Sequence, residues 1–294
     1  MRSDNRGYGD LSSEQLDPSS PQLDCKETFN VCPDSPGAGP DDFRAFDPRN
    51  PRASLSGKQP VSAAELEFRW PPDALLPGFR ATMMTYLKVA MAVAERLNRL
   101  FATDLLGPEH ADHFAPYFAD PQVTLRLLRY PVVGEVTAAR RTAAAGLTAA
   151  AAGGGGGNAE IVVGGVHTDY DQLTLLVTNG VPGLQVQHRA TGRWIDVPHI
   201  PGAIIVNVAD CLQRWTNDIY KSTPHRILAP PAERFSIALF VGPSADTVVA
   251  ALPGTGPPRY APITAGEHLK QKLDETYAFR RNSQQQQQQQ QAKL

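Results

Sequence analysis

The sequence predicts a mainly β protein, a sandwich or a barrel, with α-helices flanking the strands. Two observations lead to this prediction. Between residues 161 and 241 the chain consists of short apolar or alternating runs separated by turn signals, and many short strands at such spacing are typical of sandwiches and barrels. Helical spacing of apolar residues is found before this region, at 79–106, and a second helix is expected after it, at 266–278.

The first regular elements precede the strand-rich region. Apolar residues of Phe79–Leu106 recur on one helical face, and Gly107 and Pro108 end the predicted helix. The next segment, Val123–Tyr130, alternates between apolar and polar residues and is closed by Pro131. This pattern predicts a strand.

Six further strands are expected after residue 170. The alternation of Leu173, Leu175 and Val177 predicts a strand that is buried on one face only. The expected strands are LTLLVT (173–178), LQVQ (184–187), WIDVP (194–198), AIIVNVA (203–209), HRILA (225–229) and RFSIALFV (234–241). Turn signals between them are Asn179-Gly180, Pro182-Gly183, Thr191-Gly192 and Pro201-Gly202.

The chain is expected to have three parts: a helical and loop module at 1–120, a core at 121–245, and a C-terminal helix with a disordered glutamine-rich tail at 246–294. The core carries an insertion of Gly and Ala at 142–157. Its five consecutive glycines are not followed by Lys-Ser or Lys-Thr, so a flexible insertion is favoured over a phosphate-binding loop.

Composition excludes several classes of protein. The net charge is −2, from 28 basic and 30 acidic residues, and no basic run indicates a nucleic-acid or membrane surface. No apolar stretch reaches the length of a transmembrane helix, and the N-terminus lacks the apolar core of a signal peptide. Cys25 and Cys32 could form a disulfide, but three sparse cysteines favour reduced thiols in a cytoplasmic protein.

The stretch GGVHTDYDQLTLL suggests a metal site. His167 and Asp169 are two residues apart, and in an extended segment such residues point to the same side. An imidazole and a carboxylate aimed at one point suit a metal ion, although a third ligand is needed. His225 is the best candidate, because it follows one apolar strand and begins another. Two His and one Asp on one face of a metal are typical of non-haem Fe(II) oxygenases.

The other histidines do not fit this pattern as well. His110 forms its own H-x-D motif with Asp112, but that segment lacks strand alternation, so the two side chains should diverge. Structural or solvated roles are expected for His188, His199 and His268.

Arg234 and Ser236 again lie two residues apart, in the otherwise apolar strand RFSIALFV. A charge in such a strand is costly unless it is paired, and an Arg fork with a Ser hydroxyl suits a carboxylate ligand. The alternative is that Arg234 lies at the solvated start of the strand and pairs with Glu233. The residues alone favour neither interpretation.

Together these blocks resemble the isopenicillin-N-synthase-like Fe(II)/2-oxoglutarate dioxygenases, the branch that includes plant gibberellin and flavonoid oxidases. The matching blocks are GGVHTDYDQLTLL, GLQVQ, GRWIDVPHIPGAIIVNVADCLQRWTNDIYKSTPHR, RFSIALFVGP, TLRLLRYP, RGYGDLSSEQLDP and DCKETFNV. The resemblance covers most of the chain except the Gly/Ala insertion and the glutamine tail. It implies a double-stranded β-helix, or jelly roll, with flanking helices.

The resemblance also assigns roles to residues. His167, Asp169 and His225 would bind Fe(II), Arg234 and Ser236 would hold the far carboxylate of 2-oxoglutarate, and Tyr130 would add a hydroxyl contact. The implied activity is a dioxygenase reaction in which 2-oxoglutarate and O2 are consumed, succinate and CO2 are released, and a small organic substrate is hydroxylated, desaturated or cyclised. The expected partner is this small molecule, and the protein is expected to be a monomer.

Several departures from the family pattern are visible. The chain begins inside the family's N-terminal module, without the opening strand and first helix, which suggests truncation. LRYP replaces the Asn-Tyr-Tyr-Pro of many plant relatives, so the pocket near Tyr130 should differ. Asp171 replaces a common Gly; it is expected to point away from the metal and is not assigned as a ligand. Phe240 shares a side with Arg234 and could contact substrate or pack in the core.

Two alternatives to the dioxygenase remain. One is an Fe(II) oxidase of the same fold that uses no oxo acid and binds a substrate carboxylate with its Arg-x-Ser pair. The other is a truncated jelly roll with impaired catalysis, which would serve as a binding module. Succinate formation would exclude the first, and binding of one Fe(II) per chain would argue against the second.

Overall fold

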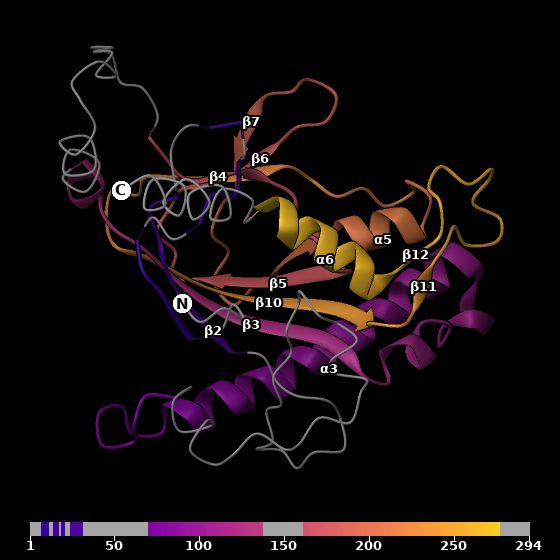
Figure 1. The fold of residues 1–294 in the computed structure, drawn as a ribbon, viewed down its shortest axis with the longest axis horizontal. Helices are drawn as coiled ribbons and strands as arrows, with labels where there is room; N and C mark the ends of the chain where they lie inside the picture. The colour runs from indigo at the N-terminus through magenta and orange to yellow at the C-terminus, as the bar shows by residue number, and fades with distance from the viewer. Residues whose placement is uncertain are drawn as a thin grey trace, which may run out of the picture.

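The structure is a computed structural model that describes residues 7–11, 14–17, 19–20, 24–31, 70–137 and 161–276. The Gly/Ala insertion, the glutamine tail and Cys32 lie outside the described residues. The described part contains two main antiparallel sheets, one short two-stranded sheet and flanking helices, as expected for a jelly roll (Figure 1).

The larger sheet has six strands in the order β1-β2-β3-β10-β5-β8. Its strands are β1 (Gly7–Gly9), β2 (Glu27–Val31), β3 (Pro121–Tyr130), β5 (Leu173–Thr178), β8 (Ile205–Val208) and β10 (Arg234–Ser244). The central strand β10 pairs with β3 on one side and with β5 on the other. The N-terminal segment therefore joins the same sheet as the core strands.

The smaller sheet has four strands in the order β4-β9-β6-β7. Its strands are β4 (Val162–His167), β6 (Leu184–Gln187), β7 (Trp194–Asp196) and β9 (His225–Leu228). A short pair, β11 (Val248–Val249) with β12 (Ile263–Thr264), lies before the last helix.

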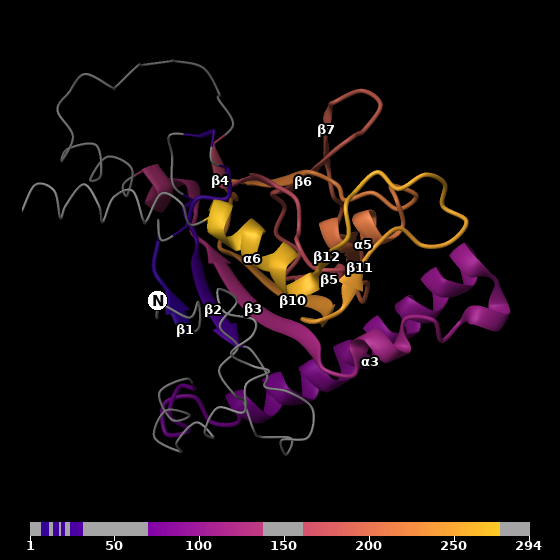
Figure 2. The same ribbon diagram turned by 45° about the vertical axis from the view of Figure 1, so that its right-hand side comes forward.

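Helices cover both sides of the large sheet (Figures 1 and 2). Helix α3 (Phe79–Leu106) lies on one face, where its buried residues Leu87 and Ala94 join a core with Leu125 and Leu175 from the sheet. Helix α6 (Ala265–Thr276) and the smaller sheet lie on the other side. Short helices, η1 (Pro108–His110), η2 (Ala115–Phe118) and α5 (Asp210–Trp215), connect the larger elements.

Most predicted elements are confirmed. The long helix has the expected bounds, and Val123–Tyr130 is a strand that begins two residues earlier. All four predicted turns contain a glycine with positive φ. The C-terminal helix is described as Ala265–Thr276, and residues beyond 276 lie outside the described part.

One prediction about burial is wrong. Leu173, Thr174, Leu175 and Leu176 are all buried, so β5 is not solvated on either face over this stretch. The reason is that α3 covers one face, while the other face lines an internal cavity. Among the described helices, none has the length and apolar composition that crossing a membrane requires.

Candidate functional site

Strand register places the two metal-ligand candidates from the smaller sheet side by side. His167, at the end of β4, is directly opposite His225, the first residue of β9. Their imidazole ring centroids are 4.2 Å apart. The sequence could not reveal this pairing, because it depends on two strands that are far apart along the chain.

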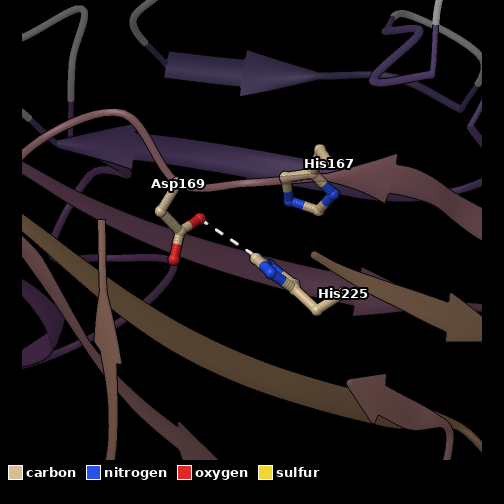
Figure 3. A group of neighbouring side chains, drawn as sticks. All are labelled: His167, Asp169 and His225. Carbon is tan, nitrogen blue, oxygen red and sulfur yellow. Dashed lines mark ion pairs between the residues drawn. The ribbon is translucent and has the colours of Figure 1, made fainter. Parts of the chain in front are cut away.

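Asp169 completes the group, although it lies outside any strand. β4 ends at His167, so Asp169 lies two residues into the connection to β5. The connection to β5 nevertheless turns the carboxylate toward the histidines, and Asp169 Oδ1 lies 3.7 Å from His225 Nε2 (Figure 3). One ligand atom from each residue lies within 4.8 Å of the others.

Hydrogen bonds prepare both histidines for a metal. His167 Nδ1 is 2.8 Å from the Gly165 carbonyl oxygen, and His225 Nδ1 is 3.1 Å from the Thr223 carbonyl oxygen. Because a carbonyl only accepts, each Nδ1 must carry the proton, and each Nε2 therefore presents its lone pair. This is the usual arrangement of metal-binding histidines.

The protonation states also suit a cation. Burial, followed by the neighbouring His225, lowers the pKa of His167 to about 3. Burial alone would raise the pKa of Asp169, but the two imidazoles and a hydrogen bond from Asn207 hold it below its ordinary value. Near neutral pH the site therefore offers a neutral imidazole and a carboxylate, the forms that bind metals. Two nitrogens and one carboxylate oxygen fit Fe(II).

Sequence reasoning did not identify Asn207 as a residue of the site. Its Nδ2 donates to Asp169 Oδ2 over 3.1 Å, and this orients the carboxylate. A polar residue inside the apolar run AIIVNVA was the available signal.

Arg234 lies in the interior and not at a solvated strand end. Its side chain is 1% exposed, and its Nε has no hydrogen-bond partner. Glu233, the alternative partner, instead pairs with Arg129. Within the described residues, Arg234 has no carboxylate partner, so its charge is available to a ligand.

The residues around Arg234 are those that the sequence named. Tyr130 is its register partner on β3, with the guanidinium 5.1 Å from the ring centroid. Ser236 Oγ accepts a long hydrogen bond of 3.5 Å from Arg234. Burial raises the pKa of Tyr130, which keeps its hydroxyl protonated.

All six predicted site residues line one cavity, together with Phe240 and several residues from α6. Asp171 also lines this cavity, so the expectation that it points away is wrong. It is not part of the metal-ligand group. Burial, followed by the Asp169 carboxylate, raises the pKa of Asp171 to about 7.

The remaining histidines lie elsewhere. His188 is in the exposed β6–β7 turn, where its Nδ1 contacts Thr191. His268 is buried on α6, with Nε2 3.2 Å from the Tyr170 carbonyl oxygen. His110 and His199 are exposed.

Comparisons with known proteins agree with this geometry. Residues 158–243 match the family model described as the 2OG-Fe(II) oxygenase superfamily, whose members use Fe(II), 2-oxoglutarate and O2. Sexual differentiation process protein isp7 of Schizosaccharomyces pombe is 30% identical over 217 residues, which is 73% of this chain and 47% of that protein. The 2-oxoglutarate-Fe(II) type oxidoreductase hxnY of Emericella nidulans is 31% identical over 217 residues, 71% of this chain and 56% of that protein.

A solved structure is also similar. A full-length protein of Neurospora crassa, crystallised in complex with alpha-KG, superposes with a TM-score of 0.65 at 29% identity, covering 92% of this chain and 75% of that one. The chain spans about half the length of the curated relatives it matches.

Proposed function

We propose that the chain is an oxygenase dependent on Fe(II) and 2-oxoglutarate, because residues 158–243 belong to the 2OG-Fe(II) oxygenase superfamily. It hydroxylates, desaturates or cyclises a small organic substrate and releases succinate and CO2. One observation carries the proposal: a single cavity holds the His167/Asp169/His225 group and the buried guanidinium of Arg234, which has no carboxylate partner among the described residues.

Each residue has a defined part in this proposal. His167, Asp169 and His225 would hold Fe(II), and the cavity that they line would receive the co-substrate and O2. Bound Fe(II) supplies the activation of O2 that no side chain can supply. Arg234 and Ser236 bind the far carboxylate of 2-oxoglutarate, and the Tyr130 hydroxyl adds a third donor there. The apolar cavity wall excludes water and aims one C–H bond of the substrate at the iron.

An anaerobic titration tests the proposal. The metal-free protein is titrated with Fe(II) and then with 2-oxoglutarate while the visible metal-to-ligand charge-transfer band is recorded. We expect a band only when both are present, and succinate once O2 and a substrate are added. Asp169→Ala and His225→Ala should lose the band while retaining the circular dichroism of the wild type.

Each other outcome points to a stated alternative. Binding of Fe(II) without the band or succinate would favour an oxidase of the same fold, with Arg234 on a substrate carboxylate. Failure to bind Fe(II) would favour a catalytically impaired jelly roll. Full activity in either Ala variant would remove that residue from the metal site.

Four narrower assignments are also part of the proposal. We place the chain in the isopenicillin-N-synthase-like branch, supported by the order of its motifs and by plant relatives such as feruloyl CoA ortho-hydroxylase 2 of Arabidopsis thaliana, which is 29% identical over 194 residues. We keep the division into parts at 1–120, 121–245 and 246–294. We also keep a cytoplasmic monomer without nucleic-acid or membrane partners as an assignment; of these features, the net charge of −2 bears only on the absence of such partners.

A further inference from the structure

We propose that Asp171 makes the substrate end of the cavity a receptor for a cationic nitrogen. The organic substrate would then be a small apolar molecule that carries an ammonium or another positively charged nitrogen group. This inference rests on the proposed function, because it names the substrate class of the same cavity.

The first support is the position of Asp171. Alternate residues of β10 face the cavity, beginning with Arg234 and Ser236 and continuing through Ala238 to Phe240. Asp171 lies beside Gly242, at the far end of this row from Arg234. The carboxylate of Asp171 and the guanidinium of Arg234 therefore lie at opposite ends, and Asp171 is outside the expected place of 2-oxoglutarate.

The second support is the space that β10 leaves for this side chain. A Cβ atom built on Gly242 would lie 2.7 Å from Asp171 Oδ1 and 3.2 Å from its Cγ. Any side chain at 242 would thus displace the carboxylate. The glycine accommodates Asp171 by close approach of the backbone and not by an unusual φ angle.

The third support is the lack of a partner. Within the described residues, the Asp171 side chain has no hydrogen bond or ion pair, whereas Asp169 accepts a hydrogen bond from Asn207. A carboxylate in a largely enclosed cavity is costly without a partner. A ligand that supplies a donor would remove this cost.

The fourth support is the charge balance of the cavity. Lys26 lines the wall, but its Nζ lies 3.1 Å from Glu14 Oε2 and 2.9 Å from Asp24 Oδ2. Arg126 also pairs with Glu14, at 3.1 Å. These four side chains, two cationic and two anionic, carry no net charge together.

Under the proposed function, the charges around the candidate metal site also cancel. The charges of Fe(II), Asp169, the 2-oxoglutarate dianion and Arg234 also sum to zero. Among the described lining residues, Asp171 in its ionised form is then the charge without a counterpart, and a cationic substrate group would complement it and favour that ionised form. The lining near it includes Phe240 and the α6 residues Leu269 and Leu273, which suit an apolar body.

Three probes that share a phenyl ring and differ in their polar group test the inference: benzylammonium, benzyl alcohol and benzoate. Binding to the full chain is measured by isothermal titration calorimetry, anaerobically, with Fe(II) and 2-oxoglutarate present. We expect benzylammonium to bind about tenfold or more tightly than benzyl alcohol, as for a hydrogen bond to a charged group, and benzoate to bind most weakly.

Asp171→Asn is the decisive variant, because it keeps the shape and removes the charge. It should lose the preference for benzylammonium while binding benzyl alcohol as the wild type does, which would show that the cavity is intact. Asp112→Asn is the matched control, since its carboxylate is 69% exposed and outside the cavity. This control should keep the preference.

Two results would overturn the inference: no preference for benzylammonium in the wild type, or a preference that survives in Asp171→Asn, as for an amine bound to the iron. The metal-free wild type and Asp171→Asn are compared in the same way. A difference there, with no charge-transfer band in the separate titration, would contradict the proposed function and leave the role of Asp171 standing. A charge-transfer band and succinate formation, without a difference between the metal-free wild type and Asp171→Asn, would support the proposed function and contradict the role of Asp171.

Discussion

Arg234→Lys tests the carboxylate-binding end of the cavity. The arginine side chain is 1% exposed, and its Nε makes no hydrogen bond in the described structure. Lysine retains the positive charge but cannot form two parallel hydrogen bonds to one carboxylate. We therefore expect the variant to bind Fe(II) normally and to require more 2-oxoglutarate.

The magnitude follows from the hydrogen bonds that are lost. A hydrogen bond to a charged group contributes about 1.5–3 kcal/mol. Losing one of two such bonds should raise the 2-oxoglutarate concentration for half-maximal charge-transfer absorbance by about 10- to 150-fold. The assay is the anaerobic titration at a fixed Fe(II) concentration.

Replacing Arg234 should weaken 2-oxoglutarate binding but stabilise the fold when 2-oxoglutarate is absent. Arg234→Met removes a buried charge that has no carboxylate partner in the described residues, so we expect the free energy of unfolding in urea to rise by about 1–3 kcal/mol. The same variant should lose the charge-transfer band. The matched control is Arg189→Met, at an exposed position in the β6–β7 turn, which should change stability by less than about 0.5 kcal/mol.

Two results would refute this reasoning. An unchanged 2-oxoglutarate requirement in Arg234→Lys would remove this arginine from the co-substrate site. A strongly destabilised Arg234→Met would show that the charge has a structural role, contrary to the missing ion pair.

Two more predictions concern buried charges and pH. Lys26→Met should lower the free energy of unfolding by about 3–5 kcal/mol in urea, because it removes the ammonium from the buried carboxylates of Glu14 and Asp24. Burial lowers the pKa of His268 to about 4, so the unfolded chain binds a proton at this site at higher pH than the folded chain does. Stability should therefore fall as the pH drops from about 6.5 to 4, by about 3 kcal/mol from this residue, and His268→Gln should remove that part of the loss.

The Lys26 prediction has a control in the same chain. Arg99→Met removes an ion pair with Asp112 in which both side chains are more than half exposed, and should cost less than about 1 kcal/mol. A similar cost for Lys26→Met would contradict the role of its buried pairs. For His268→Gln, the contradicting result is an unfolding free energy that declines with acid as steeply as in the wild type.

Much of the fold could be predicted because its signals are local. Apolar residues at helical spacing mark Phe79–Leu106, and the Gly-containing turns separate the strands. Burial of β5 on both faces could not be predicted in the same way. It depends on α3, which is distant in sequence and packs on the outer face of Leu173 and Leu175.

Two-residue spacing relates most of the residues that sequence analysis placed in the site. It relates His167 to Asp169, whose ligand atoms lie close together, although β4 ends at His167. It correctly relates Arg234 to Ser236, which both lie within β10 and both line the cavity. Asp171 is also two residues from Asp169, so the same alternation agrees with its place in the cavity, and the expectation that it points away did not follow from the spacing.

Several candidate site residues lie at the end of β4 or just after it. The β4–β5 connection directs both Asp169 and Asp171, which are two residues apart, into one cavity. His167 and Asp169 are recognisable from sequence as candidate metal ligands because their spacing is short and fixed, whereas His225 is a candidate because it lies between two apolar strands. The substrate end depends on a contact between this connection and the backbone at Gly242, about seventy residues away in the chain. Under the proposed role of Asp171, one substitution at 171 or 242 would change substrate selectivity without any change in the three candidate iron ligands.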